Sequence, residues 1–172
     1  MKAWNPLWRK APSIAPPVTN PRLVLHPTDL TRVSEKAFAV AVSLAKQNGA
    51  ELIIVYALPP PTPIYEIESS FRPDAEIALA RLAEVATEFG VSARRVLIDS
   101  TAPVSNSIVR CADDLHADMI VMGTSGKTGI ARWVAGSHAA RVIVRAHCPV
   151  VVVRDVASRR ESMKNGLSST DE

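Results

Sequence analysis

The chain has 172 residues, of which 47% are apolar and 22% are charged, and its formal net charge at pH 7 is +3. This length and composition are typical of a single globular domain and argue against a disordered or collagen-like chain. The basic residues near the two ends of the chain do not form one basic stretch, so nucleic acid is not an expected partner.

No stretch of the sequence predicts a membrane span or a secretory signal. The richest apolar window, Ala37 to Ala45, is far shorter than the roughly 20 residues that cross a bilayer. The N-terminal stretch has no apolar segment followed by a small-residue cleavage site. Cys111 and Cys148 lie far apart and without a CxxC pair, which disfavours a disulfide framework or a zinc site. We therefore expect a cytoplasmic protein with reduced cysteines and no membrane contact.

Composition along the chain predicts three segments. Residues 1–20 are rich in proline and should form a flexible arm, whereas residues 21–156 should form the folded domain. Residues 157–172 are polar and should form a disordered tail. Trp4 and Trp8 in the arm fit either a contact site for a partner or packing back onto the domain.

Predicted strands and helices alternate along the domain. The first strand, Leu23 to Leu25, is closed by His26-Pro27, because proline donates no hydrogen bond to a ladder. A helix from about Ser34 should stop at Asn48-Gly49, and a buried strand follows from Leu52 to Leu58. The later elements are a helix from Pro73-Asp74 to Gly90, a strand from Val96 to Ile98, a helix after Pro103, a strand from Met119 to Met122, a helix from Ser137 to Arg145 and a strand from Val150 to Val153.

This order of elements predicts an α/β fold with a doubly wound, mostly parallel sheet of five strands. The apolar runs do not alternate with polar residues, which fits strands covered by helices on both faces. Right-handed crossovers favour the doubly wound arrangement. In such sheets ligands bind beyond the carboxyl ends of the strands, where the strand order reverses. The stretches to inspect are therefore HPTD, YALPP and MGTSG, after the first, second and fourth strands.

A glycine-rich stretch follows the fourth strand. Gly126 to Thr128 looks like the end of a Walker A loop, but that motif needs a glycine where this chain has Val121. Another spacing is present, in which Gly123 and Gly126 are followed after nine residues by Gly136-Ser137. Taken alone, this spacing fits a phosphate cradle or an ordinary glycine turn with a serine helix cap.

Two of these motifs together resemble the nucleotide-binding universal stress proteins. That family has a first strand ending in Pro-Thr-Asp, matched by Pro27-Thr28-Asp29, and a Gly-x-x-Gly-x9-Gly-Ser/Thr motif, matched from Gly123 to Ser137. The likeness covers about residues 21–154. It implies a Rossmann-like fold of the adenine-nucleotide α-hydrolase type and binding of ATP with Mg²⁺ or Mn²⁺. It also implies a homodimer through the last strand, Val150, Val151, Val152 and Val153.

The resemblance assigns roles to individual residues. Asp29 would contact the ribose and reach the metal indirectly, through water or phosphate, and Ala57 would meet adenine through its backbone. Taken without the family, Asp29 is an ordinary helix cap and Lys127 an ordinary exposed loop residue. The residues expected to bind nucleotide are Pro27, Thr28, Asp29, Ala57, Met122, Gly123, Gly126, Lys127, Gly136, Ser137 and His138.

The glycines of the motif have a physical reason within this interpretation. A side chain at Gly123 or Gly126 would hold a phosphate away from the backbone N–H groups. Gly136 and Ser137 would present a helix N-terminus to the phosphates, and His138 could add its own backbone N–H.

Catalysis is not indicated by the sequence. The histidines at 26, 116, 138 and 147 are scattered and are expected to be structural or surface residues. The related ATP pyrophosphatases carry Ser-Gly-Gly-x-Asp-Ser after the first strand, where this chain has HPTDLT. Two functions stay open. The favoured one is an ATP-binding stress-response or regulatory module, and the alternative is a slow metal-dependent ATP hydrolase of the same fold.

Overall fold

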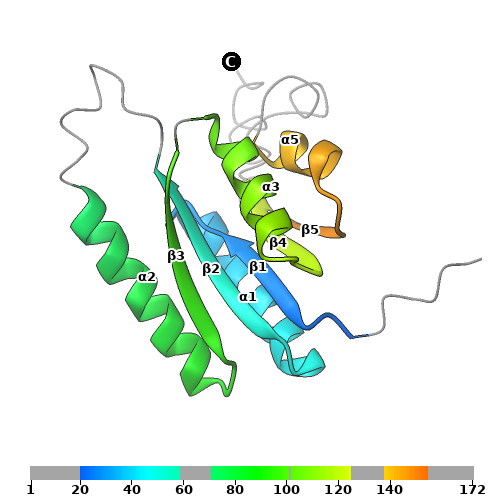
Figure 1. Cartoon of the computed structure of the whole chain (residues 1–172). Coiled ribbons are helices and arrows are strands. Elements are labelled where there is room, and N and C mark those ends of the chain that lie inside the picture. Colours follow the sequence, from blue (N-terminus) through cyan, green and yellow to red (C-terminus); the bar gives the residue numbers. More distant parts are fainter. Residues whose placement is uncertain (1–19, 59–70, 101, 125–137, 155–172) are drawn as a thin grey trace, which may run out of the picture.

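A computed structural model describes residues 20–58, 71–100, 102–124 and 138–154. The predicted arm up to residue 19, the tail from residue 155 and residues 125–137 of the glycine-rich stretch lie outside them. The elements, shown in Figure 1, are β1 (Leu23–Pro27), α1 (Arg32–Asn48), β2 (Glu51–Leu58), α2 (Phe71–Glu88), β3 (Ala93–Asp99), α3 (Val104–Asp114), β4 (Met119–Thr124), α5 (His138–Arg145) and β5 (Val150–Arg154).

The strands form one parallel sheet in the order β3-β2-β1-β4-β5. The chain runs outward from β1 through β2 to β3, then crosses back to the other side of β1 for β4 and β5 (Figure 1). The strand order therefore reverses between β1 and β4. The prediction of a doubly wound, parallel α/β sheet is confirmed.

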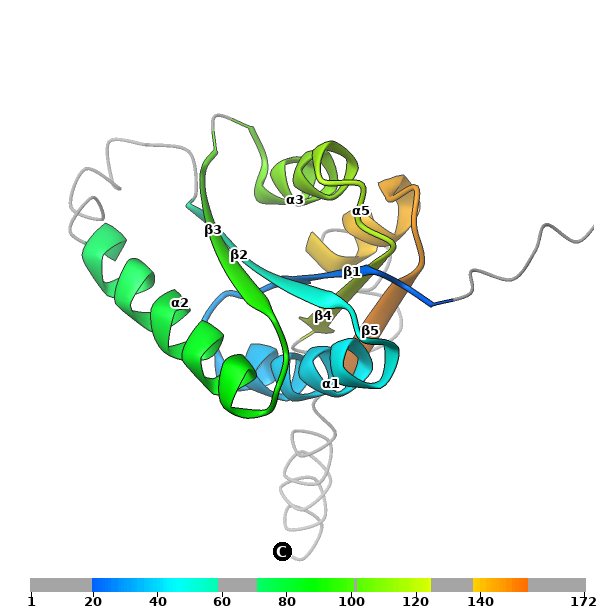
Figure 2. The same cartoon turned by 60° about the horizontal axis from the view of Figure 1, so that its bottom comes forward.

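Helices cover both faces of the sheet (Figure 2). One core cluster lies between the sheet and α1 and α2, and it contains Val24, Phe38 and Leu79. The other lies under α3 and α5 and contains Leu25 and Val142. Successive strand residues point to opposite faces, so the neighbours Val24 and Leu25 enter different clusters. This double burial explains why β1 reads as a continuous apolar run.

The edge strand β3 is longer than the sequence predicts. It begins at Ala93 and not at Val96, and Arg94 and Arg95 are exposed. Both arginines pair with β2 through their backbones, which requires no apolar side chain. The apolar pattern therefore finds only Val96 to Ile98, the consecutive half-buried residues of β3.

The end of α1 is set by Gly49. Its φ of +62° lies in the left-handed region that glycine adopts readily. The Gly49 amide donates to the Lys46 carbonyl at 3.3 Å, and the Ala50 amide donates to the Ala45 carbonyl at 2.9 Å. These bonds cap the last turn and turn the chain into β2. The predicted stop at Asn48-Gly49 is confirmed.

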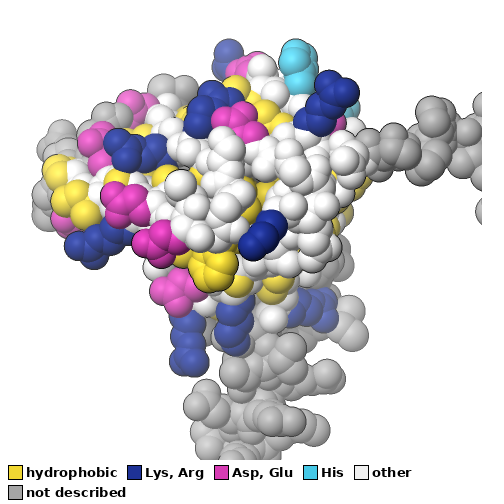
Figure 3. Space-filling model, turned by 90° about the horizontal axis from the view of Figure 1, so that it is seen from below, with side chains coloured by type: hydrophobic (Ala, Val, Ile, Leu, Met, Phe, Trp, Pro, Cys, Tyr) yellow, Lys and Arg dark blue, Asp and Glu magenta, His cyan; other side chains and the backbone are white. Residues whose placement is uncertain are grey.

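The surface at the amino ends of the strands carries charges of both signs. Figure 3 shows lysine and arginine interspersed there with aspartate and glutamate, with hydrophobic side chains in small groups. Among the described residues of that face, the basic side chains are mixed with acidic ones and do not gather into one patch. Within the ranges that the structure describes, no helix combines the length and apolar character needed to cross a membrane.

Candidate functional site

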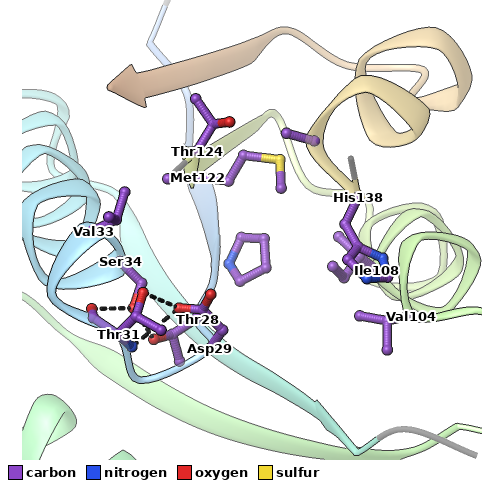
Figure 4. A pocket seen from close by; sticks show the side chains of 13 residues that line it. Thr28, Asp29, Thr31, Val33, Ser34, Val104, Ile108, Met122, Thr124 and His138 are labelled. Atoms are coloured by element: carbon purple, nitrogen blue, oxygen red, sulfur yellow. Dashed lines mark hydrogen bonds between the residues drawn. The ribbon is translucent and has the colours of Figure 1, made fainter. Parts of the chain in front are cut away.

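A cavity of about 280 Å³ lies at the carboxyl ends of β1 and β4, where the strand order reverses (Figure 4). This is the position at which open α/β sheets bind ligands. The lining residues come from the β1–α1 connection, α1, α3, β4 and α5. They are Pro27, Thr28, Asp29, Thr31, Val33, Ser34, Val104, Ile108, Met122, Gly123, Thr124, His138 and Ala139.

The cavity has a polar side and an apolar side. In Figure 4, Thr28, Asp29, Thr31 and Ser34 gather on the side of the β1–α1 connection. Val104 and Ile108 of α3 lie across from them with His138 of α5. Such a cavity suits a ligand that combines an apolar surface with several polar groups.

Hydrogen bonds preform the polar side. The Asp29 carboxylate accepts from the Thr31 amide at 3.1 Å and from the Thr31 hydroxyl at 2.6 Å. The Thr28 hydroxyl oxygen accepts from the Leu30 amide at 3.0 Å and lies 3.0 Å from the Ser34 hydroxyl. Leu30 has a φ of +59°, a conformation that costs a non-glycine residue roughly 1–2 kcal/mol. The bonds around Leu30 offset this strain and hold Asp29 at the cavity wall.

Asp29 carries a negative charge at neutral pH. Partial burial opposes its ionisation, but the Thr31 hydroxyl and amide stabilise the charged form. The net effect lowers the pKa of Asp29 below its ordinary value. Asp29 therefore offers the cavity a charged hydrogen-bond acceptor.

Gly123 packs tightly against α1. A Cβ atom added to Gly123 would lie 3.0 Å from the Val33 carbonyl oxygen and 3.1 Å from the Val33 carbonyl carbon. The sequence suggested that a side chain here would obstruct a phosphate. The structure gives a second reason for glycine, because the first turn of α1 lies so close to β4 that a side chain would require it to move by a few tenths of an ångström.

Ala57 is not among the residues that line the cavity. The Thr28 amide donates to the Val55 carbonyl at 2.8 Å, and β1 ends at Pro27, opposite Val55. Alternate residues of a strand form backbone hydrogen bonds to the same neighbouring strand. The Ala57 backbone therefore faces the same side as that of Val55, which is the β1 side, but it lies beyond the last residue of β1. It is thus directed toward the reversal point without touching the cavity.

His26 is a buried residue beside the site. Its side chain is fully buried, and its ring lies 5.7 Å from that of Phe38 between centroids. Nδ1 lies 2.8 Å from the Val121 carbonyl oxygen, while the buried Nε2 has no hydrogen-bond partner among the described residues. Desolvation by burial lowers the pKa of His26 to about 4, so the ring is neutral at neutral pH. His26 is thus a buried residue of β1 that does not itself line the cavity.

The structure brings together most of the predicted site residues that it describes. Pro27, Thr28, Asp29, Met122, Gly123 and His138 all line the cavity. Gly126, Lys127, Gly136 and Ser137 lie outside the described residues. Sequence reasoning missed Val104 and Ile108, because periodicity marks the buried stripe of α3 without showing which part of it faces a cavity.

Among the described residues, neither a metal cluster nor the larger cavity between α3 and β3 is a better candidate site. Within the described ranges, no group of three or more histidine, cysteine, aspartate or glutamate side chains is arranged to hold a metal ion. A larger cavity of about 630 Å³ lies between α3 and β3, lined by Val96, Arg110 and Leu115 among others. None of the predicted site residues lines it. It also lies away from the reversal of strand order.

Comparison with known proteins identifies the family. Residues 21–154 match the model of the universal stress protein family. The chain belongs to the universal stress protein family. A universal stress protein of Methanocaldococcus jannaschii is 36% identical over 139 residues, which cover 76% of this chain and 81% of that protein.

Solved structures of universal stress proteins share the fold. One, in complex with cAMP, is 30% identical with a TM-score of 0.58, covering 78% of this chain and 98% of that chain. Another, from Archaeoglobus fulgidus in complex with dAMP, is 23% identical with a TM-score of 0.58 and the same coverage. The latter supports the fold alone, and both relatives hold an adenine nucleotide.

The buried His26 predicts a pH dependence of stability. The imidazole takes up a proton near pH 6.5 when unfolded but only near pH 4 when folded. The free energy of unfolding should therefore fall by about 3 kcal/mol as the pH drops through this window, and remain insensitive to His26 above it. Urea titrations between pH 7 and pH 4 measure this. His26→Asn should lose this component, and equal pH slopes in both chains would contradict it.

The tight packing at Gly123 predicts that even alanine is destabilising. Gly123→Ala should lower the free energy of unfolding by about 1–3 kcal/mol, because the first turn of α1 must move away. Val33→Ala provides a matched control, since it removes the Val33 side-chain contact at 3.1 Å and leaves the carbonyl contact at 3.0 Å. The double variant should recover only part of the loss. A Gly123→Ala chain as stable as the unmodified chain would show that α1 yields freely.

Proposed function

We propose that this universal stress protein binds ATP in the cavity at the carboxyl ends of β1 and β4, and acts as a nucleotide-dependent stress-response or regulatory module. The observation that carries the proposal is the convergence of Pro27-Thr28-Asp29, Met122-Gly123 and His138 on one cavity at the reversal of strand order. The adenine nucleotide cAMP, held by the relative that is 30% identical, supports the ligand class.

Charge orients the ligand within this cavity. The ionised Asp29 would repel phosphate but accept hydrogen bonds from ribose hydroxyls or from an amino group. Direct contact between Asp29 and the phosphates is therefore disfavoured, and the phosphate chain should run toward the end of β4 and the start of α5. A helix N-terminus favours an anion, and α5 begins at His138 on the far side of the cavity. The sugar then takes the polar side.

The residues present fit Mg²⁺ that arrives with the nucleotide. Mg²⁺ keeps several waters and is commonly held by one or two carboxylates together with substrate phosphates. Asp29 is the only carboxylate among the described lining residues, and it is ionised. It could reach the ion through water, while the phosphates would supply direct ligands. Bound Mg²⁺ would offset the phosphate charge.

The same residues favour binding over hydrolysis. Asp29 and His138 are the ionisable side chains among the described lining residues. The lowered pKa of Asp29 makes it a weak base for activating water, and its carboxylate already accepts two hydrogen bonds from Thr31. We therefore favour a module that senses the nucleotide over one that turns it over.

Calorimetric titration of Asp29→Asn tests the proposed orientation. If Asp29 accepts a hydrogen bond from the sugar, the substitution should weaken ATP and AMP binding about tenfold, the size of one charge-assisted bond. Asp114→Asn removes an exposed carboxylate of α3 outside this cavity and should leave affinity unchanged. Tighter ATP binding by Asp29→Asn would place the phosphates next to Asp29 and contradict the orientation. An unmodified chain that binds no adenine nucleotide would contradict the function itself.

Hydrolysis has a separate readout. The unmodified chain, incubated with ATP and Mg²⁺ for hours, should release no more than one phosphate per protein chain. Multiple turnovers that disappear in Asp29→Ala would favour the hydrolase.

We further propose that the chain forms a homodimer through β5. This strand is at the edge of the sheet and pairs with β4 on one side. Its valines, Val150 to Val153, are half-buried in the single chain, and an apolar edge of this kind favours pairing with a second copy. A two-fold contact would bring the same strand from both chains together.

Val152 is the best position for testing the dimer. Val151 and Val153 pack against the core under α1, and Val150 packs against the core under α5, whereas Val152 belongs to neither cluster. Val152→Lys should therefore shift the mass measured by light scattering from two chains to one, with little loss of stability. A mass of one chain for the unmodified protein would contradict the dimer.

A further inference from the structure

The bond between His26 and Val121 stands where a backbone hydrogen bond is missing from the sheet. The register of β1 and β4 pairs Val24 with Met119 and Leu25 with Ile120, and its continuation places His26 opposite Val121. In a parallel ladder, the Val121 carbonyl would then accept from the amide of the residue after His26. That residue is Pro27, which has no N–H group.

The direction of the neighbouring bonds supports this assignment. The Thr28 amide donates to Val55 of β2, so the backbone nitrogen of the preceding residue faces the opposite neighbour, β4. Leu23 lies four residues before Pro27 and therefore faces the same neighbouring strand. Its carbonyl accepts from the Asp118 amide on the β4 side. Pro27 therefore presents a nitrogen without a hydrogen to β4, and the regular β1–β4 pairing ends before it.

The His26 side chain supplies the missing donor. A carbonyl oxygen only accepts, so the 2.8 Å contact requires the hydrogen on Nδ1, and this fixes the tautomer of the neutral ring. Within the described part of the chain Nε2 has no hydrogen-bond partner, and the ring packs beside Phe38. To the described residues the ring thus makes one hydrogen bond, and that bond joins β1 to β4 beyond their last paired residues, Leu25 and Ile120.

Both ends of this bond lead directly into the cavity walls. His26 is followed by Pro27-Thr28-Asp29, and Val121 is followed by Met122-Gly123-Thr124, and all six of these residues line the cavity. We propose that His26 is a positioning residue of the nucleotide site, which replaces the amide absent from Pro27 and sets the separation of the two walls. This inference rests on the proposed function.

Two substitutions distinguish the effect of the His26 hydrogen-bond donor from the effect of the packing of its ring. His26→Phe keeps a ring beside Phe38 but leaves the buried Val121 carbonyl without a donor, whereas His26→Asn keeps an N–H near the Nδ1 position. Calorimetric titration with AMP should show affinity about tenfold weaker for His26→Phe and within about threefold of the unmodified chain for His26→Asn. Equal affinities for His26→Phe and the unmodified chain would overturn the proposal.

A double-mutant cycle with Pro27→Ala tests the mechanism. Pro27→Ala restores a backbone amide that faces β4, so His26 should become dispensable. In that background, His26→Phe should weaken AMP binding by less than about threefold, whatever Pro27→Ala itself does to affinity. A tenfold loss in both backgrounds would mean that the ring acts through packing and would overturn the proposal.

A readout without nucleotide distinguishes this inference from the proposed function. In nitrogen-15 NMR spectra of the free protein, His26 should show the Nδ1–H tautomer at neutral pH. His26→Phe should shift the amide signals of Thr28, Asp29 and Gly123, and His26→Asn should largely restore them. If the unmodified chain binds no AMP, the proposed function fails and these signals alone decide the positioning role. An Nε2–H tautomer, or unmoved signals in His26→Phe, would overturn it.

Discussion

The reversal of strand order at β1 is the constraint on which the rest of the structure depends. Because β2 and β4 lie on opposite sides of β1, right-handed crossovers send α1 and α3 to opposite faces of the sheet. Side chains from α1, α3 and α5 then surround the space at the carboxyl ends of β1 and β4. The cavity is therefore a consequence of topology, and its chemistry depends on the residues placed at these strand ends.

The strand ends combine backbone restrictions with polar side chains. Pro27 removes an amide from the ladder, Gly123 permits close approach to α1, and Leu30 adopts a strained φ. Nearby hydrogen bonds stabilise this irregular backbone, such as the His26 bond to Val121 and the Thr31 bonds to Asp29. The cavity is thus preformed, and a nucleotide would meet hydrogen-bonding groups that are already oriented.

Apolar periodicity and helix stops were enough to predict the order and type of the elements. Gly49 and Pro27 marked their boundaries because their backbone restrictions act locally. The role of His26 could not be predicted, since it depends on the register between β1 and β4, which are distant in sequence. Val104 and Ile108 were missed for a similar reason. Gly123 was predicted as a site residue, but its contact with Val33 appears only when α1 is placed against β4.

The central claim is that an adenine nucleotide occupies the cavity between the ends of β1 and β4. Titration of the nitrogen-15-labelled chain with AMP, followed by NMR, tests it most directly. The account predicts the largest amide shifts at Thr28, Asp29, Gly123 and His138, with Gly90, at the far end of the sheet, unmoved. Shifts concentrated at Arg110 and Leu115, in the larger cavity between α3 and β3, would contradict the account.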